Sequence, residues 1–340
     1  MTNNTPLAAI YGCSSTVLGA EEHSFFSETR PLGFILFQRN CVSPDQIRRL
    51  VEDLRDSVGR ADAPVLIDQE GGRVQRLKPP QWRDAPPASL FAALYEKDRE
   101  RAVEAVRLNA RLLAHELDVL GITVDCAPVL DVPQAGADPI IGDRALGNDP
   151  DTISALARAA CEGFLEGGVL PVIKHIPGHG RADVDSHKAL PNIEADLNTL
   201  SKIDFAPFRA LKDMPWAMTA HVLYKALDSE QPATMSADVL KMIRQDIGFN
   251  GVLVSDDLSM QALSGSFKFR TAGALAAGCD VALHCNGDMM EMRQVAAGCA
   301  PLTPEALKRI ETGETMRLGK KIPLGMEYSD AAGILEAMVA

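Results

Sequence analysis

The sequence lacks both long hydrophobic runs and paired cysteines. No stretch approaches the run of about 18 apolar residues that a membrane-spanning helix needs. The seven cysteines are scattered and form no Cys-x-x-Cys pair, which excludes the usual zinc motifs and fits free thiols in a reducing cytosol. The N-terminal stretch 1–7 has neither a basic region nor a long apolar run, so we expect no secretory signal peptide.

Positive charge is in short supply as well. The 34 Lys and Arg residues face 46 Asp and Glu residues, which gives a net charge of -12. A protein whose main partner is nucleic acid would need a basic surface, so we expect no nucleic-acid partner. A Gly-x-Gly-x-x-Gly stretch at a strand exit is also absent, which argues against a dinucleotide cofactor.

Short apolar runs alternate with amphipathic stretches along the whole chain. The predicted strands are 7–11, 33–38, 64–68, 122–127, 169–173, 216–221, 251–256 and 280–284, and the predicted helices are 43–58, 98–120, 151–166, 197–212, 236–246, 269–277, 288–297 and 303–318. Such alternation predicts parallel strands covered by helices, and eight units predict an α/β fold of the TIM type, a closed (β/α)8 barrel. We expect one domain over residues 1–340. An open, doubly wound sheet is the alternative.

The densest group of titratable residues follows the fifth predicted strand. Lys174-His-Ile-Pro-Gly-His-Gly180 is followed closely by Asp185-Ser-His187. Three interpretations compete: a polar loop that satisfies backbone groups, a metal site, and an acid/base site in which Asp185 orients His187. Pro177-Gly178 excludes the helical spacing of a His-Glu-x-x-His metal motif, and we expect no metal.

Other charged and imidazole groups stand at further strand exits, which form the active face of such a barrel. These are Asp68 and Arg76, Arg144, His221, Asp256 and Asp257, and His284 and Asn286. Asp257 stands nearer the following segment and is assigned as a helix N-cap. Asp256 ends its strand directly, so we expect its carboxylate to project into the mouth of the barrel.

Hydrolysis of a glycosidic bond with retention needs one carboxylate that attacks the anomeric carbon and one acid that protonates the departing oxygen. Asp256 suits the first role. No Glu is present in residues 174–187, the part of the loop after the fifth predicted strand where the titratable residues are densest. His187, with Asp185 to set its tautomer, can serve as the acid and base instead.

Four motifs carry a resemblance to a known family. They are Asp68-x-Glu-Gly-Gly-Arg-Val-Gln-Arg76, Lys174-His-Ile-Pro-Gly-His-Gly180, Asp185-Ser-His187 and Ser255-Asp-Asp-Leu-Ser-Met260. In this order and spacing, over residues of about 7–300, they resemble the β-N-acetylhexosaminidases of glycoside hydrolase family 3. More closely, the chain resembles the single-domain bacterial β-N-acetylglucosaminidases of cell-wall recycling. One departure is Ile176, where the family often has Phe.

The resemblance implies a covalent glycosyl-enzyme intermediate on Asp256, with His187 as general acid/base supported by Asp185. It implies that the terminal N-acetylglucosamine is held by Asp68, Arg76, Arg144, Lys174 and His175. The implied substrate is an N-acetylglucosaminyl-1,6-anhydro-N-acetylmuramyl peptide, cleaved in the cytoplasm by a monomer without a cofactor or a membrane partner. The implied process is peptidoglycan recycling, which serves cell wall biogenesis, cell shape and cell division.

Two rival functions and one variant stay open at this point. A metal-dependent barrel hydrolase would use the histidines as ligands and lose activity on chelation. A catalytically silent sugar-binding protein would bind without turnover, although Asp256, Asp185 and His187 are all present. Phosphorolysis is a variant within the enzyme class, since a neutral imidazole repels an incoming phosphate less than a carboxylate does.

Overall fold

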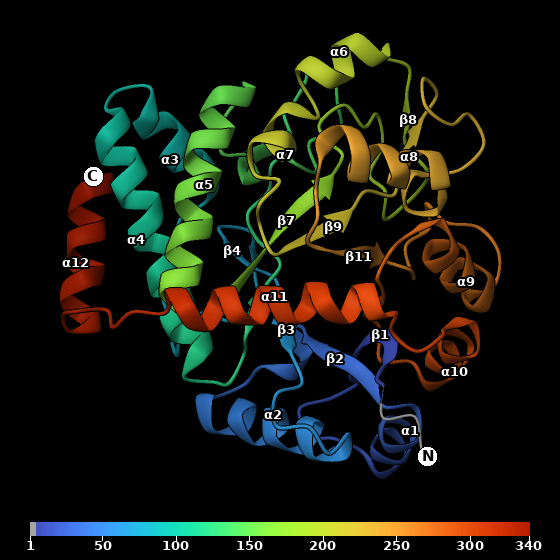
Figure 1. Cartoon of the computed structure of the whole chain (residues 1–340). Helices are drawn as coiled ribbons and strands as arrows, with labels where there is room; N and C mark the ends of the chain where they lie inside the picture. Colours follow the sequence, from blue (N-terminus) through green and yellow to red (C-terminus); the bar gives the residue numbers. More distant parts are fainter. Residues whose placement is uncertain (1–4) are drawn as a thin grey trace.

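Eight parallel strands close into a barrel in the computed structural model of the chain, which describes residues 5–340 (Figure 1). They are β1 (Leu7–Gly12), β2 (Pro31–Leu36), β3 (Val65–Ile67), β6 (Val124–Asp125), β7 (Leu170–Ile176), β9 (Trp216–Thr219), β11 (Val252–Asp257) and β12 (Val281–His284). Each pairs with its neighbours in chain order, and β1 closes the ring by pairing with both β2 and β12. The predicted (β/α)8 barrel is confirmed, and the open sheet is wrong.

The alternation of side chains along each strand divides the apolar residues into two cores. Ile10 of β1 points into the barrel with residues such as Val172 and Val254, and this cluster fills the interior. Its neighbours Ala9 and Tyr11 belong to the outer cluster, between the strands and the surrounding helices. The barrel interior is therefore a packed core, and we expect a ligand site at the ends of the strands rather than inside the barrel.

The helices form the outer layer (Figure 1). They are α1 (Ala20–Thr29), α2 (Pro44–Ser57), α3 (Ala88–Tyr95), α4 (Arg99–Asp118), α5 (Pro150–Glu166), α6 (Leu197–Lys202), α7 (Ala206–Ala210), α8 (Ala237–Met242), α9 (Phe267–Ala277), α10 (Met289–Gly298), α11 (Pro304–Lys320) and α12 (Tyr328–Val339), with short 3₁₀ or π turns η1 (Gln38–Asn40), η2 (Gly142–Arg144), η3 (Ala233–Met235) and η4 (Ile243–Ile247). Helix α2 begins as predicted: the Ser43 hydroxyl accepts a hydrogen bond from the Gln46 amide, and Pro44 occupies the first turn.

Several helical predictions are wrong. Helix α3 lies inside the Pro-rich stretch 78–97, where no helix was predicted. It can form because the prolines of that stretch all precede it and Pro87 is its N-cap. The single helix predicted over 197–212 is two helices, since Pro207 fits only the first turn of a new one. Helices α1 and α12 were not predicted. Helix α12 packs on α4, where the Tyr328 ring stacks on His115 with centroids 5.5 Å apart.

Four short strands of the described chain lie outside the barrel, in the segments that follow its strands. Strands β4 (Gln69–Gly71) and β5 (Val74–Gln75) form an antiparallel hairpin, and β8 (Asn192–Ile193) pairs with β10 (Leu223–Tyr224). The buried side chain of Gln69 closes the hairpin: its Oε1 accepts hydrogen bonds from the backbone amides of Arg76 and Leu77, at 2.8 and 3.0 Å. This contact brings Arg76 back beside the end of β3.

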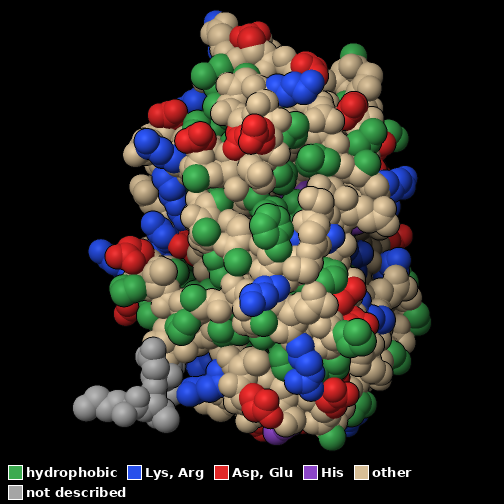
Figure 2. Space-filling model, turned by 90° about the vertical axis from the view of Figure 1, so that its right-hand side faces the viewer, with side chains coloured by type: hydrophobic (Ala, Val, Ile, Leu, Met, Phe, Trp, Pro, Cys, Tyr) green, Lys and Arg blue, Asp and Glu red, His purple; other side chains and the backbone are tan. Residues whose placement is uncertain are grey.

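The surface carries charged side chains of both signs (Figure 2). Acidic and basic side chains are interspersed on the face in Figure 2, and no basic patch gathers there among the described residues. Within residues 5–340, no helix has the length and apolar character to cross a bilayer. The prediction of no signal peptide falls partly on residues 1–4, which lie outside the described part of the chain.

Candidate active site

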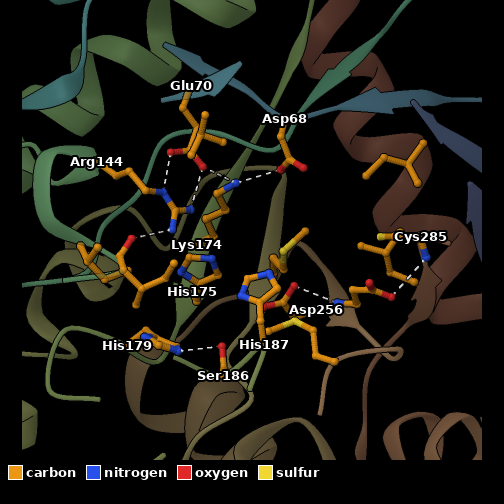
Figure 3. Close-up of a pocket in the computed structure, with 18 of the residues that line it drawn as sticks. Asp68, Glu70, Arg144, Lys174, His175, His179, Ser186, His187, Asp256 and Cys285 are labelled. Atoms are coloured by element: carbon orange, nitrogen blue, oxygen red, sulfur yellow. Dashed lines mark hydrogen bonds and ion pairs between the residues drawn. The ribbon is translucent and has the colours of Figure 1, made fainter. Parts of the chain in front are cut away.

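A cavity of about 230 Å³ lies where the barrel strands run into their following loops. Its walls come from the exits of β3, β7, β11 and β12 and from the loop that contains η2 (Figure 3). Seven of the eight residues predicted for catalysis or sugar binding line this cavity, and the exception is Asp185. The topology of parallel strands explains this convergence, because their carboxyl ends meet on one face.

A buried network of five charged side chains forms one wall (Figure 3). The Lys174 Nζ lies 3.0 Å from the Asp68 carboxylate and 2.7 Å from Glu70. Arg144 forms two hydrogen bonds of 2.8 Å with Glu70, one to each carboxylate oxygen. The Arg76 guanidinium donates to Asp68 at 2.9 Å. Four of these residues were predicted from the sequence; Glu70 was not.

The network holds its members in their charged forms. Burial alone would raise the pKa of Glu70, but the charges of Lys174 and Arg144 outweigh it and lower that pKa to about 2. Burial would likewise raise the pKa of Asp68, yet Lys174 and Arg76 hold it well below its usual value. Removing one partner of a buried ion pair typically costs about 3–5 kcal/mol, so Glu70 is needed to keep Arg144 and Lys174 in place.

A second buried group was missed at the exit of β6. The Asp131 carboxylate, fully buried, lies 2.7 Å from Nδ1 of His175 and accepts hydrogen bonds from the backbone amides of His175 and His179. The loop after β7 passes so close that a Cβ on Gly180 would lie 2.0 Å from the Val132 carbonyl oxygen. In the sequence, Asp131 is only the first residue of a predicted loop, and nothing there pairs it with a residue 44 positions later.

Asp256 projects from the end of β11 into the cavity, as predicted (Figure 3). One carboxylate oxygen accepts a hydrogen bond of 2.8 Å from the Asp257 backbone amide. Burial alone would raise the pKa of Asp256, but charge on His221 and then on His175 outweighs it, so the pKa lies below its usual value. The group is therefore ionised at neutral pH, as an attacking carboxylate must be.

Asp257 satisfies backbone donors, but the helix predicted after it is wrong. Its carboxylate accepts from the amides of Ser259 and Cys285 and from the Ser259 hydroxyl. Residues 258–263 form turns, with no helix before α9. With both oxygens engaged, Asp257 is less available than Asp256 for attack on a substrate.

The Asp185–His187 pair forms in the loop after β7. The Asp185 carboxylate lies 2.8 Å from Nδ1 of His187 and also accepts from the His187 backbone amide at 2.9 Å. Burial would raise the pKa of Asp185, but these hydrogen bonds lower it. The His187 side chain is 65% exposed and lines the same cavity as Asp256 (Figure 3).

The remaining imidazoles have other surroundings. Burial lowers the pKa of His179 to about 4, so it is neutral, and its Nε2 lies 3.1 Å from the Ser186 hydroxyl. Both nitrogens of His221 are engaged, with Thr234 and with the Asp257 carbonyl. His284 pairs with Glu291 outside the cavity. Among residues 5–340, no three His, Cys, Asp or Glu side chains are arranged to hold a metal ion.

Comparisons with known proteins agree on one family for this chain. Residues 19–312 match the model of the glycosyl hydrolase family 3 N-terminal domain. The chain is 39% identical to a β-hexosaminidase of Methylococcus capsulatus over 79% of this chain and 80% of that protein. It is 38% identical to a β-hexosaminidase of Alkalilimnicola ehrlichii, over 81% of this chain and 79% of that protein.

Solved structures agree over the full length. Native NagZ from Neisseria gonorrhoeae has a TM-score of 0.87 at 30% identity and covers 99% of this chain and 98% of its own. The same protein in complex with N-trifluoroacetyl-D-glucosamine also has a TM-score of 0.87, at 29% identity, with 99% of both chains covered. The prediction of a glycoside hydrolase of the β-N-acetylhexosaminidase class is confirmed, and the chain belongs to glycosyl hydrolase family 3.

Proposed function

We propose that the chain is a retaining β-N-acetylglucosaminidase that removes terminal N-acetylglucosamine from N-acetylglucosaminyl-1,6-anhydro-N-acetylmuramyl peptides. The observation that carries this proposal is one cavity lined by an ionised carboxylate, Asp256, and by His187, an imidazole paired with Asp185. These are the two functions that retaining hydrolysis needs. A similar protein binds an N-acylated glucosamine, which supports the sugar assigned here.

In the first step, the Asp256 oxygen that is free of the Asp257 amide attacks the anomeric carbon. The Nδ1 of His187 is held by Asp185, so Nε2 is the atom that gives its proton to the departing glycosidic oxygen. The sugar–oxygen bond breaks as the ester to Asp256 forms. In the second step, the same Nε2 takes a proton from water, whose oxygen attacks the anomeric carbon and releases Asp256.

The charged wall of the cavity is proposed to hold the sugar. Asp68, Arg76, Arg144, Lys174 and His175 offer donors and acceptors that suit hydroxyl groups and an amide, and all five line the cavity. Arg76 is held beside Asp68 by their ion pair of 2.9 Å. Glu70 supports the wall by pairing with Arg144 and Lys174.

The biological setting is part of the same proposal. We propose that residues 1–340 act as a single catalytic domain and as a monomer, in the cytoplasm, in peptidoglycan recycling. The processes served would be cell wall biogenesis, cell shape and cell division. The cytosolic setting is supported by seven cysteines, all free thiols in the structure.

Water is proposed as the acceptor in the second step. Each cationic residue that lines the cavity within the described chain is paired with a carboxylate: Arg73 with Asp143, Arg76 with Asp68, Arg144 with Glu70, and Lys174 with Asp68 and Glu70. A phosphate binds best where Arg or Lys donors are free to pair with it. The paired cations leave a phosphate acceptor without such a site.

Product analysis on a nitrophenyl N-acetylglucosaminide tests this function. We expect free N-acetylglucosamine with and without added phosphate, and an unchanged rate after a chelator has removed divalent metals. A sugar 1-phosphate product would show phosphorolysis instead. Activity that is lost on chelation and restored by zinc would favour the metal-dependent hydrolase, and binding without turnover would favour the sugar-binding protein.

A further inference from the structure

Two carboxylate–imidazole pairs, rather than one, present their imidazoles to the cavity. Besides the exposed Asp185–His187 pair, the buried Asp131 carboxylate contacts His175, whose side chain lines the cavity. One Asp131 oxygen, Oδ1, accepts from the amides of His175 and His179, at 3.2 and 2.6 Å. The other oxygen, Oδ2, faces Nδ1 of His175 at 2.7 Å.

This arrangement determines which nitrogen of His175 carries a proton. Burial alone would raise the pKa of Asp131, but the charge and hydrogen bond of His175 lower it, so the carboxylate is ionised at neutral pH. An ionised carboxylate only accepts hydrogen bonds. Nδ1 of His175 therefore bears the proton. Within residues 5–340, the hydrogen bonds of His175 to Asp131 use its backbone amide and Nδ1, so Nε2 is left for the cavity that the side chain lines.

We propose that Asp131 is a positioning residue: it fixes the tautomer of His175 so that Nε2 meets the bound sugar as a hydrogen-bond acceptor. The inference rests on the proposed glycosidase function. Asp131 itself is fully buried and does not line the cavity, so it acts through His175. The sequence motif Lys174-His175 thus depends on a residue from the preceding strand exit.

Other groups around these residues set the background charge. Asp257 of β11 donates its backbone amide to Asp256. The other groups that interact with Asp256 are His221 after β9, His179 and His187 of the loop after β7, Cys126 after β6, and Cys285 after β12. Those that interact with Asp131, besides His175 and His179, are Arg144, Asp204 and Tyr224. A substitution at Asp131 leaves these residues in place but removes a negative charge that acts on His179, Arg144, Asp204 and Tyr224. The ¹⁵N shifts of His175 itself are therefore needed to assign an effect to its tautomer.

The Asp131→Asn variant separates tautomer control from simple packing. Its amide oxygen can keep the two backbone hydrogen bonds now accepted by Oδ1, while its NH₂ group takes the place of Oδ2. Facing a donor, Nδ1 of His175 must become the acceptor, and the proton moves to Nε2. The shape of the side chain is kept, so the changes are the position of the hydrogens and the loss of one negative charge, and a control must reproduce the second change.

The measurements are kcat/KM on a nitrophenyl N-acetylglucosaminide and the imidazole ¹⁵N shifts of the uniformly labelled enzyme. We expect kcat/KM to fall by about 10- to 100-fold, the range typical when a partner that orients a metal-binding histidine is lost. The ¹⁵N shifts of His175 should change from the Nδ1-protonated to the Nε2-protonated pattern.

The matched control is Asp280→Asn. Asp280 is also a buried carboxylate, paired with Arg244 and Arg309, and it does not line the cavity. This control loses a buried negative charge in the same way, so it should lower the melting temperature without changing kcat/KM or the ¹⁵N shifts of His175. An active wild type together with unchanged kcat/KM and unchanged His175 shifts in Asp131→Asn would overturn the inference, whereas an inactive wild type would overturn the proposed function. If Asp131→Asn does not fold, the ¹⁵N shifts of His175 in the wild type decide alone: protonation at Nε2 only would contradict the inference.

Discussion

Replacing Asp256 with alanine should abolish turnover while leaving the fold intact. Asp256 is half-buried at the end of β11, carries its charge at neutral pH, and has one oxygen free of the Asp257 amide. Loss of a covalent nucleophile typically reduces kcat by about 10⁴- to 10⁶-fold. Steady-state rates on a nitrophenyl N-acetylglucosaminide measure the loss, and circular dichroism checks the fold.

Asp257→Asn is the matched control for Asp256→Ala. The asparagine oxygen can still accept hydrogen bonds from the Ser259 and Cys285 amides, which the Asp257 carboxylate now accepts at 3.0 and 3.2 Å. This variant should keep its turnover. An active Asp256→Ala variant would refute the assignment. An inactive Asp257→Asn variant would also refute it, because it would identify Asp257 as the nucleophile.

The second large effect concerns His187→Ala, and it should depend on the leaving group. General acid/base help is typically worth about 10²- to 10⁴-fold. We expect a loss of that size in kcat/KM on a sugar disaccharide, whose alkoxide-like leaving group needs a proton. The loss should be mild on a dinitrophenyl glycoside, because that phenol departs without one. Removing Asp185 should give a smaller loss in the same direction, since His187 would remain but lose its 2.8 Å partner.

Equal losses on both substrates in the glycosylation step would show that His187 is not the proton donor. His175 and His179 would then be the next candidates. The exposed position of His187, with 65% of its side chain in solvent, is compatible with a loop that closes over the substrate. Its place in the same cavity as Asp256 means that the unliganded chain already brings the two groups to one site.

The barrel could be predicted because its signals are local. The strands are short apolar runs, and the start of helix α2 is signalled by Ser43, Pro44 and the buried face of Ile47 and Leu50. The site followed from the barrel, because Asp68 directly follows β3, and Lys174 and Asp256 lie near the ends of β7 and β11. Asp185 and His187 were paired from their spacing alone, and the structure contains that pair.

The missed residues depend on contacts that are distant in the sequence. Glu70 lies 74 positions from Arg144, and Asp131 lies 44 positions from His175. No local pattern joins such residues; only the closing of the barrel does. Helix α12 was missed for a related reason, because few of its side chains are buried, Ala331 and Leu335 among them, and its place is set by α4.

The central claim, a covalent intermediate on Asp256, is tested most directly by trapping it. A 2-fluoro or 5-fluoro sugar substrate slows release of the intermediate, so that the labelled enzyme can be digested and its peptides weighed. The account predicts that the added sugar mass is found on the peptide that contains residues 252–257. Fragmentation of that peptide should place the mass on Asp256, the half-buried carboxylate at the end of β11. A label on Asp257, or no label in an enzyme that still turns over the unmodified substrate, would contradict it.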